Sequence, residues 1–273
     1  MRSFPISPLS LLKELKQNKD LILSLTRREI SSKYKGSILG GVWAIFIPVF
    51  MLAVYTFVFS IVFKAKWNGL ETESKSTFAL LLFAGLIVFN FFSDCFNSAP
   101  RLILNNSNYV KKVVFPLDIL PITISLSALF NLVLSVLVWI SFYSIEVGLP
   151  HLTVLLLPLA ILPLYFMSLG FCWLFSALGV YIRDIGQVVG IATTVLMFLS
   201  PIFFPIQALP VEFREYLDYN PLAQSISMMR DILFWGKVPD ISNYMIYLFQ
   251  CFIFCIFGYI FFQKTRKGFA DVL

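Results

Sequence analysis

The sequence predicts an all-α integral membrane protein with six transmembrane helices in one membrane domain. Hydrophobic residues make up 59% of the 273 residues, mean hydropathy is +0.84, and only 13% of residues are charged. This composition is far from that of a soluble domain. The apolar residues gather into six stretches of 18–30 residues, against the roughly 20 that a helix needs to cross a bilayer. Continuous runs of this length indicate helices, because the strands of a membrane barrel are short and alternate in polarity.

The predicted spans, in chain order, are residues 38–63, 78–95, 117–145, 152–181, 185–206 and 241–262. No Asp, Glu, Lys, Arg or His lies deep inside any of them. A titratable group within the bilayer usually marks an ion path, a proton relay or a catalytic centre. We therefore expect the chain to contain none of these, and the spans leave no room for a separate catalytic domain.

Other signs of catalysis are missing from the sequence. It holds no G-x-x-x-x-G-K-[ST] phosphate loop, so we expect no ATP site of that type in this chain. His151 is the single histidine, and no acidic cluster accompanies it to hold a metal ion. The sequence therefore predicts no catalytic residue, no metal site and no cofactor in this chain, and it argues against an enzyme.

Residues 1–37 form the first predicted element, a cytoplasmic amphipathic segment at the membrane interface. Leu21, Ile22, Leu25 and Ile30 give it a modest apolar face. Its cations either form a solvated basic leader or lie near phospholipid phosphates or the anionic head group of a lipid substrate. These cations are Arg27, Arg28, Lys33 and Lys35. We expect no cleaved signal peptide, because no short apolar core with a small-residue cleavage site is present.

The basic residues predict the orientation of the chain in the membrane. Counting the N-terminal segment and the connections on the same side, 15 Lys and Arg lie on one side and 6 on the other. By the positive-inside rule the richer side is the cytoplasm. Both termini, including the tail 264–273, are therefore expected in the cytoplasm.

Two aromatic stripes lie on opposite sides of the first predicted span when residues are placed at about 100° intervals. One stripe is Trp43, Phe46, Phe50 and Phe57, and the other is Tyr55, Phe59 and Phe63. Each stripe either faces lipid and neighbouring helices or lines a path for a sugar chain, because aromatic faces stack against pyranose rings without fixing a register. Such a path would include aromatic residues at the end of the fifth span, namely Phe198, Phe203 and Phe204.

The polar residues between the second and third spans form either a plain basic loop or a docking element for a soluble partner. This segment, 99–116, contains Arg101, Asn105, Asn106, Asn108, Lys111 and Lys112. A second, very short cytoplasmic turn consists of Arg183 and Asp184. Since sequence neighbours on a helix do not face each other, we expect each of these two residues to bond elsewhere.

The fifth predicted span is irregular, because Pro201 and Pro205 break the helix before it clears a bilayer. The following residues, up to 240, are too many for a tight turn and too apolar for a free loop. Ile226, Met229 and Leu233 share one helical face. We therefore predict that residues 201–240 form a re-entrant segment with a short helix dipping into the outer leaflet.

Small and polar residues inside the spans predict contacts between helices. Ser168, Cys172 and Ser176 recur at four-residue spacing, which lets another helix come close. Asn90 and Asn131 lie within spans, where an uncharged amide typically forms hydrogen bonds across helices.

Several motifs, found in the same order, resemble those of permease subunits of polysaccharide-exporting ATP-binding-cassette (ABC) transporters. They are Arg28, Glu29, Ile30, Lys33, Tyr34, Leu39, Gly40, Trp43, Ala44 and Pro48 at the entry to the first span, then 111–116 (KKVVFP), 183–185 (RDI), 200–203 (SPIF), and 220–222 (NPL) with 230–231 (RD). The closing 269–273 (FADVL) is similar to the tail of O-antigen exporter permeases of the Wzm type. The resemblance covers nearly the whole chain.

The resemblance implies a homodimer of six-span subunits docked on two cytoplasmic ABC ATPase subunits, which bind ATP and Mg²⁺. It implies export of an undecaprenyl-diphosphate-linked O-antigen across the bacterial inner membrane, among membrane lipids and without nucleic acid. The ATPase would contact residues 20–34 and 99–113, and aromatic residues of the first and fifth spans would line the path. The coupling residues would be Arg101, Asn105, Asn106, Lys111, Lys112, Arg183 and Asp184.

Three alternatives remain at the level of sequence. A permease for teichoic acid or capsular polysaccharide belongs to the same class and has too similar a sequence to be separated. A passive channel or lipid scramblase would leave the docking-like segment 99–116 unexplained. A membrane-embedded transferase acting on polyprenyl lipids would need clustered acidic residues, which the spans lack.

Overall fold

The computed structural model describes residues 8–62, 67, 75–112, 115–217 and 219–273. Within these ranges the regular structure is helical and includes no strand, which confirms the predicted all-α fold. The helices are α1 (Pro8–Gln17), α2 (Lys19–Tyr34), η1 (Gly40–Val42), α3 (Trp43–Tyr55), η2 (Thr56–Val62), α4 (Lys75–Asn105), α5 (Ser107–Lys112), α6 (Ile119–Glu146), η3 (Leu152–Leu156), α7 (Leu157–Tyr181), α8 (Ile185–Leu199), η4 (Ile206–Ala208), α9 (Val211–Leu217), α10 (Ala223–Arg230), η5 (Asp231–Trp235), α11 (Ile241–Thr265), η6 (Arg266–Gly268) and α12 (Phe269–Val272).

Five helical stretches of the described chain are long and apolar enough to cross a membrane, and they overlap five of the six predicted spans. They are Gly40–Phe59, Ser76–Asn105, Ile119–Glu146, Leu152–Tyr181 and Ile241–Val272. The remaining apolar helix, α8, has 15 residues. Its length of about 22 Å is less than the hydrocarbon core of roughly 30 Å. The predicted break is confirmed, because α8 ends at Leu199 and Ser200 is extended.

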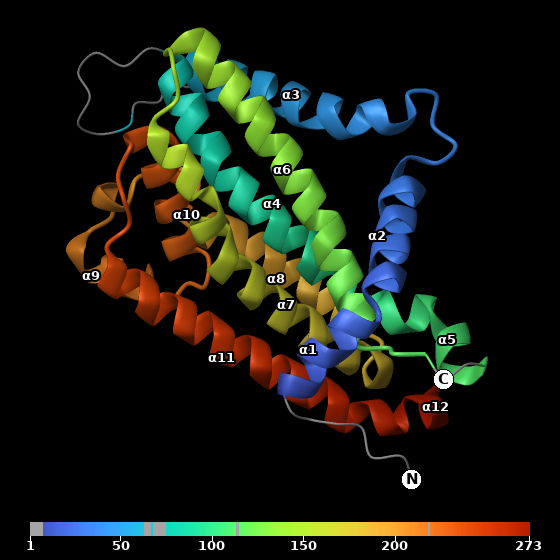
Figure 1. The fold of residues 1–273 in the computed structure, drawn as a ribbon. Helices are drawn as coiled ribbons and strands as arrows, with labels where there is room; N and C mark the ends of the chain where they lie inside the picture. Colours follow the sequence, from blue (N-terminus) through green and yellow to red (C-terminus); the bar gives the residue numbers. More distant parts are fainter. Residues whose placement is uncertain (1–7, 63–66, 68–74, 113–114, 218) are drawn as a thin grey trace.

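Helix α4 lies at the centre of the bundle, with α6, α7, α8 and α10 packed against it (Figure 1). Of its most apolar window, 83% is buried within the chain, against 11% for the window of Gly40–Phe59, which holds α3. Figure 1 shows α3 running across the end of α6 and away from the other helices. The apolar surface of α3 is therefore left for lipid or for another chain to cover.

Small residues let α7 come close to its two main neighbours, as predicted for this helix. A Cβ atom at Gly258 of α11 would overlap the carbonyl oxygen of Gly170 on α7, and one at Gly179 would overlap the carbonyl oxygen of Pro100 on α4. Cys172 is fully buried, and its Sγ lies 3.3 Å from the carbonyl oxygen of Cys95. These contacts bring the backbones of α4, α7 and α11 together.

The second span is longer than its predicted extent of residues 78–95. Helix α4 continues through Pro100 to Asn105, and α5 follows after one residue. The predicted polar segment 99–116 is therefore largely helical, with its first turns inside α4. The helix continues past Pro100, whose backbone lies against Gly179 of α7, so the predicted end at residue 95 was too early.

Ionisable residues lie deeper in the helical bundle than the sequence predicted. Asp94 lies more than two turns before the end of α4 because the helix extends past the predicted boundary. Asp118, just before α6, is fully buried and forms an ion pair of 3.0 Å with Arg266 at the end of α11. The expectation of spans without deep titratable groups is corrected at Asp94, whose charge is paired with a cation of α2.

The segment after α8 folds back onto α4 through α10. The predicted apolar face is confirmed: Ile226, Met229 and Leu233 are fully buried. Arg230 is also buried, and its guanidinium donates hydrogen bonds to backbone carbonyls of α4 and of the chain directly after α8. A buried cation is costly unless its N–H groups are satisfied, and here backbone oxygens satisfy them.

Candidate translocation path and docking face

A polar stripe runs along the otherwise buried helix α4. In the described part of α4, the exposed side chains are all polar: Asn90, Asn97, Ser98, Arg101 and Asn105. At 3.6 residues per turn these positions fall within about 100° of one another. A hydroxyl-rich molecule could form hydrogen bonds along this stripe.

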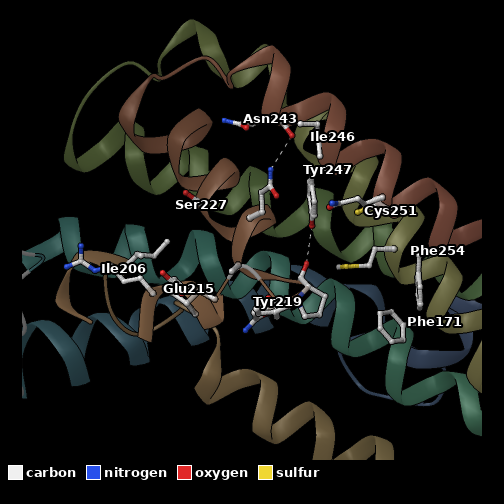
Figure 2. A pocket seen from close by; sticks show the side chains of 18 residues that line it. Phe171, Ile206, Glu215, Tyr219, Ser227, Asn243, Ile246, Tyr247, Cys251 and Phe254 are labelled. Carbon is white, nitrogen blue, oxygen red and sulfur yellow. Dashed lines mark hydrogen bonds between the residues drawn. The ribbon is translucent and has the colours of Figure 1, made fainter. Parts of the chain in front are cut away.

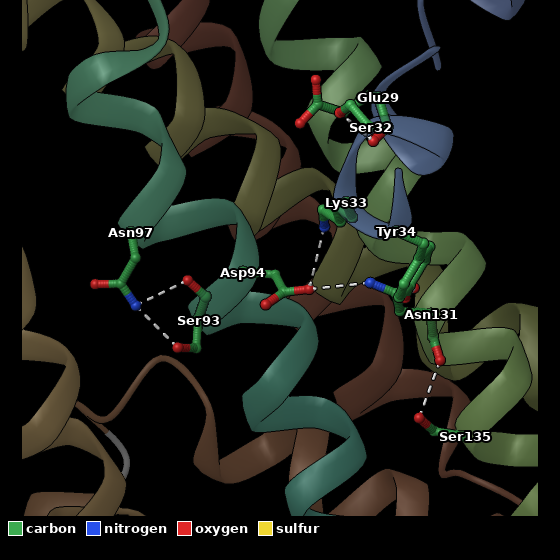
Figure 3. Close-up of polar contacts among 9 residues, drawn as sticks. All are labelled: Glu29, Ser32, Lys33, Tyr34, Ser93, Asp94, Asn97, Asn131 and Ser135. Atoms are coloured by element: carbon green, nitrogen blue, oxygen red, sulfur yellow. Dashed lines mark hydrogen bonds and ion pairs between the residues drawn. The ribbon is translucent and has the colours of Figure 1, made fainter. Parts of the chain in front are cut away.

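Asp94 lies between α2, α4 and α6 and joins them (Figure 3). Its Oδ2 is 3.7 Å from Nζ of Lys33 and accepts a 3.3 Å hydrogen bond from Nδ2 of Asn131. The hydroxyl of Tyr34 donates to Oδ1 of Asn131 over 3.5 Å. Burial, followed by the nearby Asp94 carboxylate, raises the pKa of Tyr34. The prediction that Asn131 bonds across helices is confirmed.

Asn97 connects the stripe to α8. Its Nδ2 donates to the carbonyl oxygen and the Oγ of Ser93, over 3.0 and 2.9 Å, and these contacts orient the amide (Figure 3). The hydroxyl of Thr193 on α8 then donates to Oδ1 of Asn97 over 3.1 Å. Asn90, for which we also predicted a bond across helices, is exposed and has no such bond within the described chain.

The first aromatic stripe of α3 lies on its uncovered side. Phe46, Phe50 and Phe57 are 44%, 55% and 57% exposed. Phe46 stacks on Phe50 with ring centroids 5.8 Å apart, and Trp43 meets Phe46 edge to face at 5.3 Å. Trp43, Phe46 and Phe50 are therefore in ring contact along α3, and Phe57 is exposed further along, in η2.

The opposite stripe faces inward. Phe59 stacks on Phe78 of α4 at 5.7 Å and on Phe203 at 5.9 Å, and Phe203 in turn stacks on Phe198 at 6.0 Å. Phe198 is 62% exposed and Phe204 is half-buried. The residues after α8 therefore meet the stripe of Phe59, whose predicted third member, Phe63, lies outside the described residues.

The two segments expected to face an ATPase touch each other. Nη1 of Arg28 on α2 donates a 3.0 Å hydrogen bond to the hydroxyl of Tyr109 on α5, and the Tyr109 ring stacks on Phe115 at 4.3 Å. Helix α5 lies at the same end of the bundle as the C-terminal helix α12 (Figure 1). This end of the molecule therefore brings together α2, α5 and α12.

The other predicted coupling residues lie near this surface or lead to it. Arg101 and Asn105 are the exposed end of the α4 stripe, and Nδ2 of Asn106 donates to the carbonyl oxygen of Leu102. Arg183 and Asp184 are exposed in the turn between α7 and α8. Lys111 and Lys112 are the last two residues of α5.

The predicted lipid-facing cations separate into two environments. Arg27 and Lys35 are exposed, as is Arg28 apart from its bond to Tyr109. Lys33 instead pairs with Asp94.

Sequence reasoning missed Asp94, although a carboxylate followed by polar residues at 97, 98 and 101 is a recognisable helical spacing. Arg230 was found in the sequence as part of a motif, but its hydrogen bonds to backbone carbonyls were not predicted.

The sequence profile of the ABC-2 type transporter family matches residues 20–234, which is most of the chain. This chain belongs to the ABC-2 type transporter family. The match begins in α2 and ends in η5, so it covers the α4 stripe, the exposed face of α3, and helices α2 and α5 from Asp20 onward.

Curated relatives of this ABC-2 type transporter chain are similar over nearly their full lengths. The O-antigen export system permease protein RfbA of Klebsiella pneumoniae is 25% identical over 255 residues, which is 93% of this chain and 95% of the relative. RfbA of Myxococcus xanthus is 25% identical over 263 residues, 96% and 98% of the two chains. The polysialic acid transport protein KpsM of Escherichia coli is 26% identical over 222 residues, 80% and 82%.

Proposed function

We propose that this ABC-2 type transporter chain is the permease subunit of an ATP-driven exporter of O-antigen linked to undecaprenyl diphosphate. It works as a homodimer in the bacterial inner membrane, with both termini in the cytoplasm and two ABC ATPase subunits docked there. The ATPase subunits bind ATP and Mg²⁺, and this chain itself carries no catalysis. The similarity to the RfbA permeases supports this choice of substrate class.

The polar stripe of α4 is the observation on which this proposal depends. In a helix otherwise buried, the chain leaves uncovered a row of amides, a hydroxyl and a guanidinium. Polar groups facing lipid are costly, so the stripe requires a polar neighbour. A glycan passing between two protomers would provide hydrogen bonds for it, and the exposed aromatic rings of α3 would stack on sugar faces.

The docking face, formed by α2 and α5, is where the ATPase subunits would transmit the energy of ATP hydrolysis to the permease. The Lys33–Asp94 ion pair and the Arg28–Tyr109 hydrogen bond connect α2 to α4 and to α5. A push by the ATPase on α5 and α2 would therefore reach the middle of α4 through two direct contacts. We infer that ATP-driven closure of the partner pair changes the packing of α2 against α4 and α6.

Two serines allow a matched test of the path. Ser98 lies on the α4 stripe, and Ser144 is equally an exposed serine on a long apolar helix, α6. Each would be changed to Leu in cells that make lipid-linked O-antigen, and surface glycan and co-purified ATPase would be measured. We expect Ser98→Leu to reduce surface glycan severalfold with the ATPase still bound, and Ser144→Leu to leave both unchanged. Equal export by the two variants would contradict the proposed path.

The similarity to KpsM makes a capsular polysaccharide the second candidate substrate. Chemical analysis of the glycan that accumulates inside cells lacking this chain distinguishes the two. Accumulation of lipid-linked O-antigen supports the first proposal, whereas accumulation of capsular polymer supports the second.

A further inference from the structure

A second candidate site lies apart from the proposed path. An open pocket of about 1040 Å³ is lined mainly by α7, α9, α10 and α11 (Figure 2). No lining residue in the described chain comes from α3, α4 or α8. The volume is at the upper end of the range for small-molecule sites, and the export proposal assigns it no role.

The wall of the pocket changes from polar to aromatic along α11. Asn243 and Gln250 line it in the first turns of this helix, and Phe254 lines it further along. Spacings of seven and four residues place these three on one helix face. The ring of Phe171 on α7 lies 4.6 Å from that of Phe254, and Figure 2 shows the two rings together at one end, with Glu215 well away from them. The pocket is therefore amphipathic.

Two opposite charges line the polar part. Nε and Nη2 of Arg214 donate to the carbonyl oxygens of Leu209 and Gln207 over 3.0 and 2.8 Å, which fixes the guanidinium in place. Within the described residues Arg214 forms no ion pair, and Glu215 forms neither an ion pair nor a hydrogen bond. The pocket thus presents an anchored cation and a carboxylate that are not paired with each other.

We propose that this pocket binds one zwitterionic phospholipid with a phosphoethanolamine head group, from the leaflet on the side of α9 and α10. The lipid phosphate lies at Arg214, the ammonium group lies at Glu215, and an acyl chain extends towards Phe171 and Phe254. Phosphatidylglycerol would place its phosphate near Arg214 in the same way, but its neutral glycerol head would offer Glu215 no cation. A neutral saccharide would leave both protein charges without a partner.

The bound lipid would connect elements that otherwise meet over a small area. Its head group contacts α9, and its acyl chain lies along the pocket-facing sides of α7 and α11, so it holds the segment after α8 against the last long helix. This role is independent of what the permease exports.

Native mass spectrometry of the purified full-length chain tests the proposal. The chain is stripped of lipid and offered equal amounts of phosphatidylethanolamine and phosphatidylglycerol with identical acyl chains. We expect one phosphatidylethanolamine to be retained in preference to phosphatidylglycerol. Arg214→Gln should weaken retention of both lipids by about tenfold, as for loss of a hydrogen bond to a charged group, and Glu215→Gln should remove the preference for phosphatidylethanolamine. Glu212→Gln is the matched control, because Glu212 is exposed on the same helix and does not line the pocket.

Equal retention of the two lipids by the unchanged chain would overturn the proposal, and so would identical behaviour of Glu215→Gln and Glu212→Gln. Displacement of the lipid by a neutral oligosaccharide at millimolar concentration would do the same. Because Arg214 also bonds to the backbone, Glu215→Gln decides the outcome if Arg214→Gln misfolds. Surface glycan measured in the same variants keeps this test separate from the export proposal, since either can fail alone.

Discussion

Nη1 of Arg230 donates a 2.6 Å hydrogen bond to the carbonyl oxygen of Pro201. The same guanidinium donates to the carbonyl oxygens of Ile202 and Leu81 over 2.7 and 2.9 Å, and its Cζ lies 4.5 Å from the centre of the Trp67 ring. The break after α8 leaves carbonyl groups without helical partners. One side chain of α10 satisfies two of them and connects the break to α4.

Replacing Arg230 by Met should destabilise the chain by about 3 kcal/mol or more, because three hydrogen bonds to a charged group are lost at once. Arg230→Lys keeps the charge but not the planar fork of donors, so its loss should be intermediate. Thermal unfolding in detergent measures both. Lys237→Met is the control, since Lys237 is exposed beside the same region. Equal stability of Arg230→Met and Lys237→Met would contradict the assigned role.

Gly258→Ala should destabilise the contact between α7 and α11 by about 1–3 kcal/mol through overpacking. The added methyl group would overlap the backbone of Gly170, which cannot move without displacing α7. Gly190→Ala on α8 is the matched control, because a Cβ atom there meets no atom within 4 Å. Thermal unfolding of the two variants, made in the same detergent, measures the difference. If both variants unfold at the same temperature, the close contact between the backbones of Gly258 and Gly170 would be contradicted.

Asp94→Asn should change the free energy of unfolding by less than about 1 kcal/mol, because Lys33 and Asp94 keep 35% and 45% of their side-chain surface exposed. If the pair transmits movement from α2 to α4, the variant should still reduce export. The exchange Lys33→Asp with Asp94→Lys restores the pairing and should recover part of the surface glycan. Recovery no better than with either single change would show that the pair carries no coupling.

Phe57→Ala and Phe59→Ala should separate function from stability on η2, which continues α3. Phe57 is exposed, so its loss should leave stability unchanged and, on the proposed path, lower export. Phe59 packs on Phe78 and Phe203, so its loss should cost about 2 kcal/mol or more. Surface glycan and thermal unfolding, measured on both variants, give the two readouts. Unchanged export by Phe57→Ala would remove this stripe from the path.

The contact of α1 with the rest of the chain should weaken as pH rises through about 7. Burial, followed by the nearby Asp118 carboxyl group, raises the pKa of Glu14 to about 7. Oε2 of Glu14 and Oδ2 of Asp118 are both buried without a hydrogen bond in the described structure, so a proton shared between them would stabilise the contact. Arg266, paired with Asp118, and Tyr259 are the other titratable groups facing this cluster.

The sign follows from proton linkage. A carboxyl group with a raised pKa holds its proton more tightly when α1 is docked, so the stabilising contribution is present at low pH and is lost above the raised pKa. Hydrogen exchange of α1 should therefore be faster at about pH 8 than at about pH 6, after correction for intrinsic exchange. Glu14→Gln should remove most of this difference. An unchanged pH dependence in that variant would contradict the assignment.

The apolar spacing of the sequence was enough to predict which segments form long helices and where α8 stops. Long runs of leucine and phenylalanine form helices in a bilayer, because a helix satisfies its own backbone hydrogen bonds. Pro201 and Pro205, close together, predict the end of the helix that precedes them. The end of α4 could not be predicted in the same way. Pro100 is locally unfavourable inside a helix, and the close packing of its backbone against Gly179, nearly eighty residues away, is not visible in the local sequence.

In the candidate site too, patterns within one helix could be predicted from the sequence, whereas contacts between distant elements could not. The aromatic stripes of α3 are a periodic pattern within one helix, so they were found, but which stripe is covered depends on Phe78 and Phe203 from other elements. The Lys33–Asp94 pair joins residues about sixty positions apart. Lys33 lies near the end of the predicted N-terminal segment, and Asp94 lies near the end of the predicted second span. Spacing along one helix carries no information on such a pairing. The pocket beside α9 likewise combines four helices that no single motif connects.

The central place of α4 also constrains how the protein is made. It is the second long apolar helix to leave the ribosome, yet α7, which covers much of it, starts about 50 residues later. At translation speeds of about 5–20 residues per second this is an interval of about 3–10 seconds. During that time Asn97 lacks its partner from α8, Thr193. The insertion machinery must therefore shelter α4 until the second half of the chain has been synthesised, and a chain truncated after α6 would be a substrate for membrane quality control.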